Sequence, residues 1–360
     1  MKRKRAAAIL AACAGLILLA GCGSEKQKTF EQAGTDLEQG NYEAALQGYE
    51  SSVNNEVKLL QSYRGMGIAQ LRLGNYDEAI EAFTKALGCE RTAKNLEKDI
   101  YTYRITASLL AGYYEDAMAD CQVLAQNYDM DADCYFLTGK AALALDAYDE
   151  AELNFKQAYG EDSTYERAIQ IYEVYLEQDM EADGTRYLEA VLSQEPKGTQ
   201  DLCDRGRIYY YMEDYANART ELTEAVNKGS SEAVLLLGMV YTAQEDYANA
   251  RTMYQQFINQ SMSEDGTKEG LSAAMGYNGL ALLDIAEENY DSALQNIDTG
   301  ISFAQGDELQ SLLFNEIVVY EKKLDFATAQ QKAQSYLESY PDDEEAAREL
   351  AFLKSRTGTE

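Results

Sequence analysis

The sequence contains no histidine and no tryptophan, and it has only 2 prolines among 360 residues. The absence of histidine excludes Ser-His-Asp and Cys-His nucleophilic sites, histidine metal ligands and the usual general base near neutral pH. The absence of tryptophan removes the ring platform on which sugar-binding sites rely heavily. With so few prolines there is little to break a helix, and 46% of the residues are hydrophobic. The composition therefore predicts a folded, mostly helical protein.

Positive charge is also scarce. The chain has 31 Lys and Arg residues against 62 Asp and Glu residues, which gives a formal net charge of −31 at pH 7. Nucleic acids and anionic lipid surfaces repel a chain of this charge. We therefore expect no nucleic-acid partner.

The first twenty-two residues have the order of a secretory signal peptide. A basic block, Lys2 to Arg5, precedes an unbroken run of apolar and small residues, Ala6 to Ala20. A helix of that run rises about 22 Å, which is short of the roughly 30 Å hydrocarbon core of a bilayer. The pattern therefore favours an export signal over a membrane-spanning anchor.

The end of this run, Leu19-Ala20-Gly21-Cys22, resembles the lipobox of bacterial lipoproteins at every position. The resemblance implies cleavage before Cys22, a diacylglyceryl group on its sulfur, and anchoring on the extracytoplasmic face of the cell membrane. Residues 1–21 would then be the signal peptide, and residues 22–28 the lipidated cysteine and a short tether. The alternative is an uncleaved helix, or an ordinary signal peptide with a chance cysteine.

Four cysteines lie beyond the export signal: Cys89, Cys121, Cys134 and Cys203. They form no CxxC pair, so neither a zinc site nor a thioredoxin-like motif is indicated. An exported protein can form disulfides, but the spacing assigns none.

The rest of the chain repeats a short motif. Gly40-Asn41-Tyr42-Glu43-Ala44-Ala45 recurs 34 residues later as Gly74-Asn75-Tyr76-Asp77-Glu78-Ala79. Further copies place a tyrosine three residues before an alanine, at Tyr114, Tyr148, Tyr215, Tyr247 and Tyr290. A degenerate copy is expected around Asp179 to Leu192. Such a period is typical of stacked repeats that complete their core only against neighbours.

Each unit reads as a helical hairpin. Downstream of one tyrosine, residues Tyr76, Ala79, Phe83 and Ala86 fall on one helical face. Upstream of several tyrosines lies a glycine where two helices must cross closely: Gly67, Gly139, Gly206, Gly238 and Gly279. The turn of each hairpin is expected at the Gly-Asn, Glu-Asp or Glu-Asn pair.

These units resemble tetratricopeptide (TPR) repeats, which have the same order of small residue, aromatic, alanine, aromatic and alanine. The best match is Gly67, Tyr76, Ala79, Phe83 and Ala86. The resemblance implies an all-α fold, a right-handed α-solenoid of about nine hairpins over residues 29–343. A capping helix, Glu344 to Lys354, and a polar tail would fill residues 344–360. Two departures are tyrosines in place of the family's tryptophan and a closing proline only near Pro196 and Pro341.

Two short motifs resemble the start of a ligand-binding site, but each lacks residues that such a site requires. Gly65-Met66-Gly67 has no third glycine at Gln70, so it does not make a dinucleotide fingerprint. Asp129, Asp131 and Asp133 imitate the start of a calcium loop, but the sixth and twelfth places hold Cys134 and Lys140. A helix-capping turn accounts for the aspartates better. We therefore expect no metal, no cofactor and no catalytic residue.

The TPR resemblance implies that the first helix of each hairpin lines a binding groove. Basic and acidic residues at the groove places nearly balance, and aromatic and aliphatic anchors lie among them. The candidate groove residues are Arg64, Arg72, Phe136, Lys140, Arg207, Tyr210, Tyr211 and Met239, and the same places include Leu283 and Asp284. The alternative for each residue is that it packs between helices. The basic residues do not reproduce the lysine-asparagine clamp of chaperone-binding TPR domains.

These observations predict a lipid-anchored, extracytoplasmic scaffold that binds a protein or peptide and catalyses nothing. By resemblance, such lipoproteins act in envelope assembly, secretion, pilus biogenesis or control of cell-wall enzymes. Two alternatives are a small-solute-binding lipoprotein and a helical-toroid hydrolase. The partner and the oligomeric state stay open at the level of the sequence.

Overall fold

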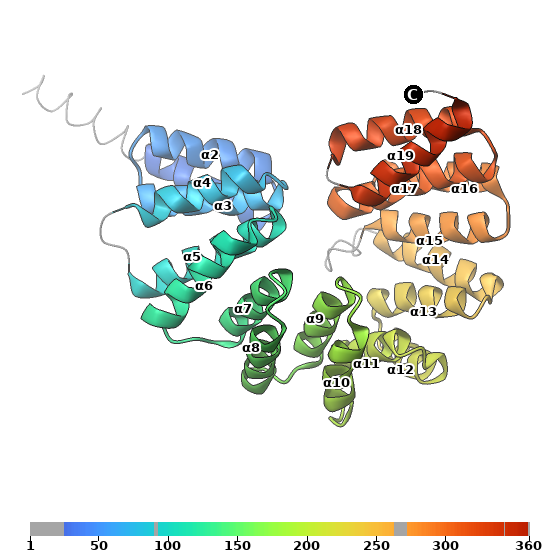
Figure 1. The fold of residues 1–360 in the computed structure, drawn as a ribbon, viewed down its shortest axis with the longest axis horizontal. Coiled ribbons are helices and arrows are strands. Elements are labelled where there is room, and N and C mark those ends of the chain that lie inside the picture. Colours follow the sequence, from blue (N-terminus) through green and yellow to red (C-terminus); the bar gives the residue numbers. More distant parts are fainter. Residues whose placement is uncertain (1–24, 90–92, 263–271, 342, 359–360) are drawn as a thin grey trace, which may run out of the picture. The chain divides into compact units, whose positions relative to one another are not determined.

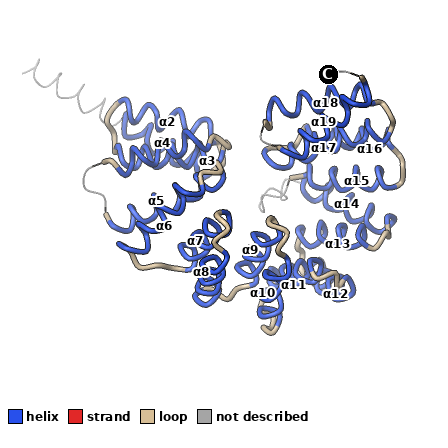
Figure 2. The backbone as a smooth tube through the Cα atoms, viewed as in Figure 1, coloured by secondary structure: helices blue, strands red, loops and turns tan. Residues whose placement is uncertain are grey.

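A computed structural model describes residues 25–89, 93–262, 272–341 and 343–358. Every regular element in these ranges is an α-helix, and none is a strand (Figure 2). The predicted all-α class is therefore confirmed. The expected signal peptide, residues 1–21, and the expected lipidation site at Cys22 lie outside the described residues. Within the described ranges, no helix combines the length and the apolar character needed to cross a bilayer.

First and second helices alternate along the chain (Figure 1). The first helices are residues 25–38, α3 (Leu59–Arg72), α5 (Lys94–Leu110), α7 (Ala132–Ala144), α9 (Tyr165–Leu176), α11 (Thr199–Tyr211), α13 (Ser231–Ala243), α15 (Ala273–Ala286) and α17 (Gly306–Lys322). The second helices are α2 (Tyr42–Asn54), α4 (Tyr76–Leu87), α6 (Tyr114–Asn127), α8 (Tyr148–Glu161), α10 (Glu181–Leu192), α12 (Tyr215–Asn227), α14 (Tyr247–Ser261), α16 (Tyr290–Ile301) and α18 (Phe326–Ser339). The capping helix is α19 (Glu344–Thr357).

The helices group into two compact units, Met1–Arg167 and Ala168–Glu360. Within each unit, helical hairpins stack on their sequence neighbours, which is the arrangement of an α-solenoid. The degenerate copy expected around Asp179 is a hairpin too, since α10 packs on α9 through Gly184.

The turns explain why the repeated motif takes several forms. The residue two places before each tyrosine adopts a positive φ, near 76–79° in Gly40, Gly74 and Gly112 and near 57–59° in Asp146, Glu213, Glu245 and Glu288. This left-handed residue ends the first helix, and the backbone N–H of the next residue then bonds back to that helix, as from Asn75 to Gln70 (2.9 Å). Glycine adopts this conformation freely, but the aspartates and glutamates adopt it as well. The turn therefore keeps its geometry although the residue type at this position differs between repeats.

In four hairpins a bulky second-helix side chain lies against a glycine of the first helix: Phe83 against Gly67, Phe155 against Gly139, Leu222 against Gly206 and Tyr254 against Gly238. The Phe155 ring is fully buried, and a Cβ added at Gly139 would lie 2.6 Å from it. Phe83 meets Gly67 in the same way, at 2.5 Å. Small residues are therefore required at these positions because they let the two helices approach.

We expect Gly139→Ala to lower the free energy of unfolding by about 1–2 kcal/mol, because the new methyl group cannot fit beside the fixed ring of Phe155. Gly160→Ala is the matched control. Gly160 lies in the same hairpin with open space around it, so alanine should raise stability by up to about 1 kcal/mol through its helix propensity. Urea denaturation followed by circular dichroism measures both, and equal effects would contradict the packing account.

Candidate functional site

The first helices of neighbouring hairpins contact each other directly within each unit. In the N-terminal unit α3 contacts α5 and α5 contacts α7, and in the C-terminal unit α11 contacts α13, α13 contacts α15 and α15 contacts α17. We call the inner face the residues that lie twelve, eight and four places before the first residue of the following second helix. The candidate groove residues lie there, except Tyr210, which precedes Tyr211 by one place.

In the N-terminal unit, Arg64 of α3 is paired with Asp99 of α5. Its Nε lies 2.5 Å from one carboxylate oxygen of Asp99 and a terminal nitrogen lies 3.1 Å from the other. Burial lowers the pKa of Arg64, but the hydrogen bond and charge of Asp99 outweigh it and raise the pKa. The guanidinium also lies 5.3 Å from the centre of the Tyr103 ring. Arg64 therefore joins two adjacent hairpins.

The other N-terminal candidates differ in exposure. Arg72 is exposed at the end of α3, whereas Lys140 and Phe136 of α7 are half-buried. The Phe136 ring packs 6.0 Å from the Phe155 ring, and the Arg167 guanidinium lies 5.0 Å from its centre. Of the three, Arg72 presents the most accessible surface to a partner.

In the C-terminal unit, Arg207 of α11 is paired with Glu232 of α13, which also accepts a hydrogen bond of 3.1 Å from Gln200. The Tyr211 hydroxyl donates to Glu173 of α9 at 2.7 Å. Burial, together with this carboxylate, raises the pKa of Tyr211. Both Arg207 and Tyr211 thus join first helices of neighbouring hairpins.

Three further aromatic rings pack in a chain that starts at Tyr211. Its ring lies 5.0 Å from that of Tyr172 and 6.1 Å from that of Tyr210, which in turn lies 6.1 Å from Tyr215. Tyr210 and Met239 are half-buried. Tyr210 and Tyr215 also pack against the buried cluster that includes Leu222 and Leu236.

Acidic side chains close to the inner face are paired with arginines of neighbouring hairpins. Asp99, Asp133 and Glu232 occupy one register, fifteen places before the second helix, and each is bonded to an arginine of a neighbouring first helix: Arg64, Arg167 and Arg207. The charges are therefore used in pairs between hairpins. That the candidate residues bind a partner stays a prediction. Arg64, Arg207 and Tyr211 also have a structural role, because each bonds to the first helix of a neighbouring hairpin.

Two groove places were misassigned from the sequence. Leu283 and Asp284 are buried, with Asp284 only 2% exposed. The Asp284 carboxylate accepts hydrogen bonds from Arg251 of α14 (2.8 Å) and from Ser292 and Asn296 of α16 (2.7 Å each). It therefore ties α15 to both neighbouring second helices and does not face a groove. The sequence signal that could have indicated this buried position of Asp284 is the pair of polar residues Ser292 and Asn296, which lie one turn apart on α16.

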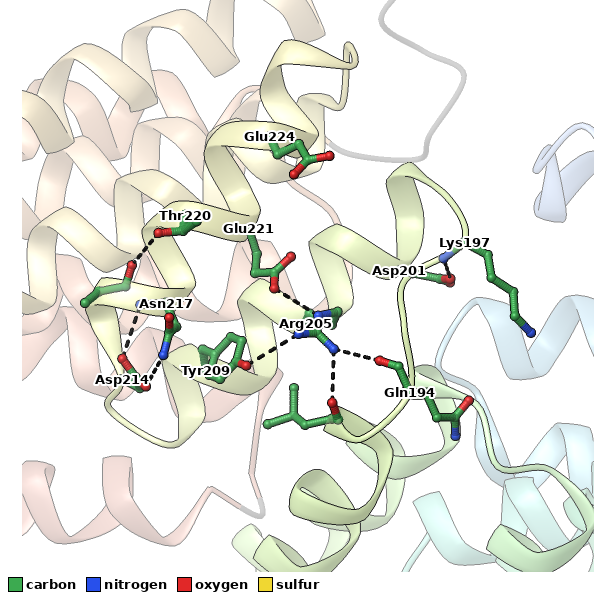
Figure 3. A network of polar contacts seen from close by, with 12 residues as sticks. Gln194, Lys197, Asp201, Arg205, Tyr209, Asp214, Asn217, Thr220, Glu221 and Glu224 are labelled. Atoms are coloured by element: carbon green, nitrogen blue, oxygen red, sulfur yellow. Dashed lines mark hydrogen bonds and ion pairs between the residues drawn. The ribbon is translucent and has the colours of Figure 1, made fainter.

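A second set of ion pairs, missed in the sequence, lies within hairpins. Arg104–Asp120 (2.7 Å), Arg205–Glu221 (3.0 Å) and Lys332–Glu316 (2.7 Å) share one register, and the last has its charges exchanged. Each pair joins residues sixteen places apart in sequence. Arg205 also donates to the carbonyls of Leu192 (3.2 Å) and Gln194 (2.9 Å), which fastens α11 to the end of α10 (Figure 3).

We expect Arg205→Ala to lower the free energy of unfolding by about 3 kcal/mol, because it leaves the largely buried Glu221 and two carbonyls without their donor. Lys228→Ala is the control. It removes the solvent-exposed ion pair between Lys228, at the end of α12, and Glu224 in the same helix. That change should cost less than about 0.5 kcal/mol. Urea denaturation of the two variants checks the contrast, and similar losses would contradict it.

Of the three aspartates that imitate a calcium loop, Asp131 caps a helix, as expected. Asp131 accepts the backbone N–H of Cys134 (2.9 Å) at the start of α7 and binds Lys98 Nζ (2.5 Å). Burial raises the pKa of Asp131, but these hydrogen bonds outweigh it and lower the pKa to about 2. Across the described ranges, no three Cys, Asp or Glu side chains gather in a way that could hold a metal ion. Cys121, Cys134 and Cys203 are buried free thiols.

Comparison with known proteins identifies the hairpins. Tetratricopeptide repeat models match residues 61–90, which cover most of α3 and α4, and residues 203–264, which cover most of α11 to α14. The chain contains tetratricopeptide repeats. The matched segments include the hairpins of Arg64, Arg72, Arg207, Tyr210, Tyr211 and Met239.

Among curated proteins, the chain is similar to the Hsp70/Hsp90 co-chaperone cns1 of Schizosaccharomyces pombe, with 32% identity over 95 residues. This match covers 26% of each protein, so the chain spans about a quarter of the co-chaperone. Among solved structures, a tetratricopeptide repeat protein from Parabacteroides merdae is 17% identical, with 70% of this chain and 98% of that chain covered and a TM-score of 0.46. MamA from Desulfovibrio magneticus is 19% identical, with coverage of 47% and 93% and a TM-score of 0.40.

Proposed function

We propose that the protein is a lipid-anchored, extracytoplasmic TPR scaffold that binds a protein partner and catalyses no reaction. The observation that carries the proposal is the set of TPR hairpins, whose first helices present exposed and half-buried side chains such as Arg72, Tyr210 and Met239. Aromatic, arginine and methionine side chains are the types enriched in protein interfaces.

The similarity to a co-chaperone supports a protein as the ligand. We do not propose chaperones as partners of this chain, because the match covers only a quarter of that protein. In addition, the basic residues Arg64, Arg72, Lys140 and Arg207 do not reproduce the lysine-asparagine clamp of chaperone-binding TPR domains. We propose a role in envelope assembly, secretion or control of wall enzymes, because the resemblance of Leu19 to Cys22 to a lipobox predicts export.

The anchor has its own test. We expect Cys22→Ser to move the protein from the membrane fraction to the soluble or secreted fraction, because the acylated sulfur is lost. Cys89→Ser, in the same full-length chain, is the control and should stay in the membrane fraction. Metabolic labelling with a fatty-acid analogue followed by fractionation measures both. Unchanged fractionation and labelling of Cys22→Ser would contradict lipid anchoring.

Partner binding is tested by in-cell crosslinking of the lipidated protein. We expect one protein to be captured in near-equal amount by the wild type and lost from the variant Arg207→Glu with Tyr210→Ala. Arg219→Glu with Tyr148→Ala is the matched control, since both residues are exposed on second helices. Circular dichroism of both variants establishes that they are folded.

Two results would contradict the scaffold proposal. If no protein is captured, the alternative of a small-solute-binding lipoprotein is favoured. If the purified protein turns over wall polysaccharide, the alternative of a helical-toroid hydrolase is favoured. Capture of the same protein by both double variants would move the binding surface away from α11.

A further inference from the structure

The N-terminal unit has two edges that differ in charge. The two helices of a hairpin are antiparallel, so the starts of the first helices lie at one edge and the hairpin turns lie at the opposite edge (Figure 1). We call residues 25–28, 54–59 and 93–98, at the starts of the first three first helices, the tether edge. We call residues 38–43, 72–78 and 110–116, at the turns of the same hairpins, the turn edge.

Contacts join the helix starts of the tether edge. Lys58 directly precedes α3, and its Nζ lies 4.6 Å from the centre of the Phe30 ring in the preceding first helix. Arg64 of α3 is paired with Asp99 of α5, and each is the sixth residue of its helix. The three helix starts therefore form one surface.

The exposed charges of the two edges have opposite signs. Within the described ranges that define the tether edge, the exposed charged side chains are four lysines and two glutamates: Lys26, Lys28, Lys58, Lys94, Glu25 and Glu56. Within those of the turn edge, they are one arginine and six carboxylates: Arg72, Glu38, Glu43, Asp77, Glu78, Glu115 and Asp116. The tether edge thus carries a positive excess in a strongly acidic chain.

The positive excess ends at the fourth first helix. Asp129 and Asp131 precede α7, and both accept from Lys98, whose Nζ lies 2.7 Å from the Asp129 carbonyl oxygen and 2.5 Å from the Asp131 carboxylate. The surface that can attract an anion is therefore limited to the helix starts nearest the beginning of the array.

Screening makes the local charge of an edge decide what it attracts. At physiological ionic strength the Debye length is about 8 Å, and lysines within that distance of an anionic lipid surface are attracted to it. The helix α3 has 14 residues and spans about 21 Å. When the tether edge lies at a membrane, the carboxylates of the turn edge are more than two Debye lengths away.

The tether edge is also the part of the described chain closest in sequence to Cys22. Three residues lead from Cys22 to Glu25, and each adds at most about 3.6 Å, so the two lie within about 11 Å of each other. A diacylglyceryl group on Cys22 would therefore hold the start of the first helix close to the lipid headgroups.

We propose that the tether edge binds anionic phospholipid headgroups through its four exposed lysines, and so places the hairpin turns of the N-terminal unit away from the bilayer. This inference rests on the proposed lipid anchor at Cys22 and adds a second contact with the same membrane. Leu59, next to Lys58, is 37% exposed and gives the surface an apolar side chain that can enter the membrane interface.

The test measures how fast lysines react in the vesicle-bound protein. Purified lipidated protein is added to preformed vesicles and acetylated with an N-hydroxysuccinimide ester, and mass spectrometry follows each lysine. The vesicles contain phosphatidylcholine alone, or phosphatidylcholine with about 30% phosphatidylglycerol. We expect Lys58 and Lys94 to react at least about threefold more slowly on the anionic vesicles, because headgroups cover them. Salt at about 0.5 M should remove the difference.

Lys156 and Lys228 are the internal controls of the same experiment. Both are exposed, Lys156 on α8 and Lys228 at the end of α12, and both should react at equal rates on the two kinds of vesicle. Slower reaction of these lysines by the same factor would show general shielding and overturn the inference.

Lys26→Glu with Lys28→Glu is the decisive variant, because both residues are exposed and can be replaced without loss of the fold. It should remove most of the protection of Lys58 and Lys94, since the surface that they share loses its positive charge. Lys156→Glu with Lys228→Glu is the matched control and should leave that protection unchanged.

Flotation of the vesicles separates this inference from the proposed anchor. If the protein floats with both kinds of vesicle and its lysines react equally on both, the inference is overturned and the anchor is retained. Protection that persists in the Lys26→Glu, Lys28→Glu variant overturns the inference as well. A protein that floats with neither kind of vesicle contradicts the anchor, and the inference with it.

Discussion

The close approach of the two helices in each hairpin is the contact on which the rest of the structure depends. A bulky second-helix side chain fills the space that a first-helix glycine leaves open, as Phe155 does against Gly139 and Tyr254 does against Gly238. The left-handed residue before each second helix turns the chain so that these two surfaces meet. Because a hairpin buries only one side in this way, its other side packs on the next hairpin, and repetition produces the stack.

Charge then fixes how neighbouring hairpins are joined. Ion pairs form within hairpins, such as Arg205–Glu221, and between hairpins, such as Arg207–Glu232, in a chain that is strongly acidic. The first-helix arginines Arg64, Arg167 and Arg207 are therefore already paired. On α13, α15 and α17 the place of Arg207 holds Met239, Leu282 and Val318, so the surface available to a partner differs from one first helix to the next.

The sequence predicts the hairpins well because each depends on residues close together in the chain. The tyrosines mark the starts of second helices, and in the degenerate copy the roles are exchanged, since Gly184 of the second helix α10 lies against Tyr172 of the first helix α9. The capping helix begins at Glu344 as expected and runs on to Thr357, where Gly358 ends it with a φ of 73°. The sequence could not assign Asp284 to the interior or pair Arg64 with Asp99, because both depend on how one hairpin is rotated against the next.

The central claim is that the inner face of the first helices binds a protein. Site-specific photo-crosslinking in cells tests it most directly, with the crosslinking residue placed in turn at the exposed inner positions Arg72 and Leu282 and at the exposed outer positions Glu81 and Leu153. The account predicts adducts with one protein from an inner position and none from the outer ones. Adducts from the outer positions alone, or equally from both sets, would contradict it.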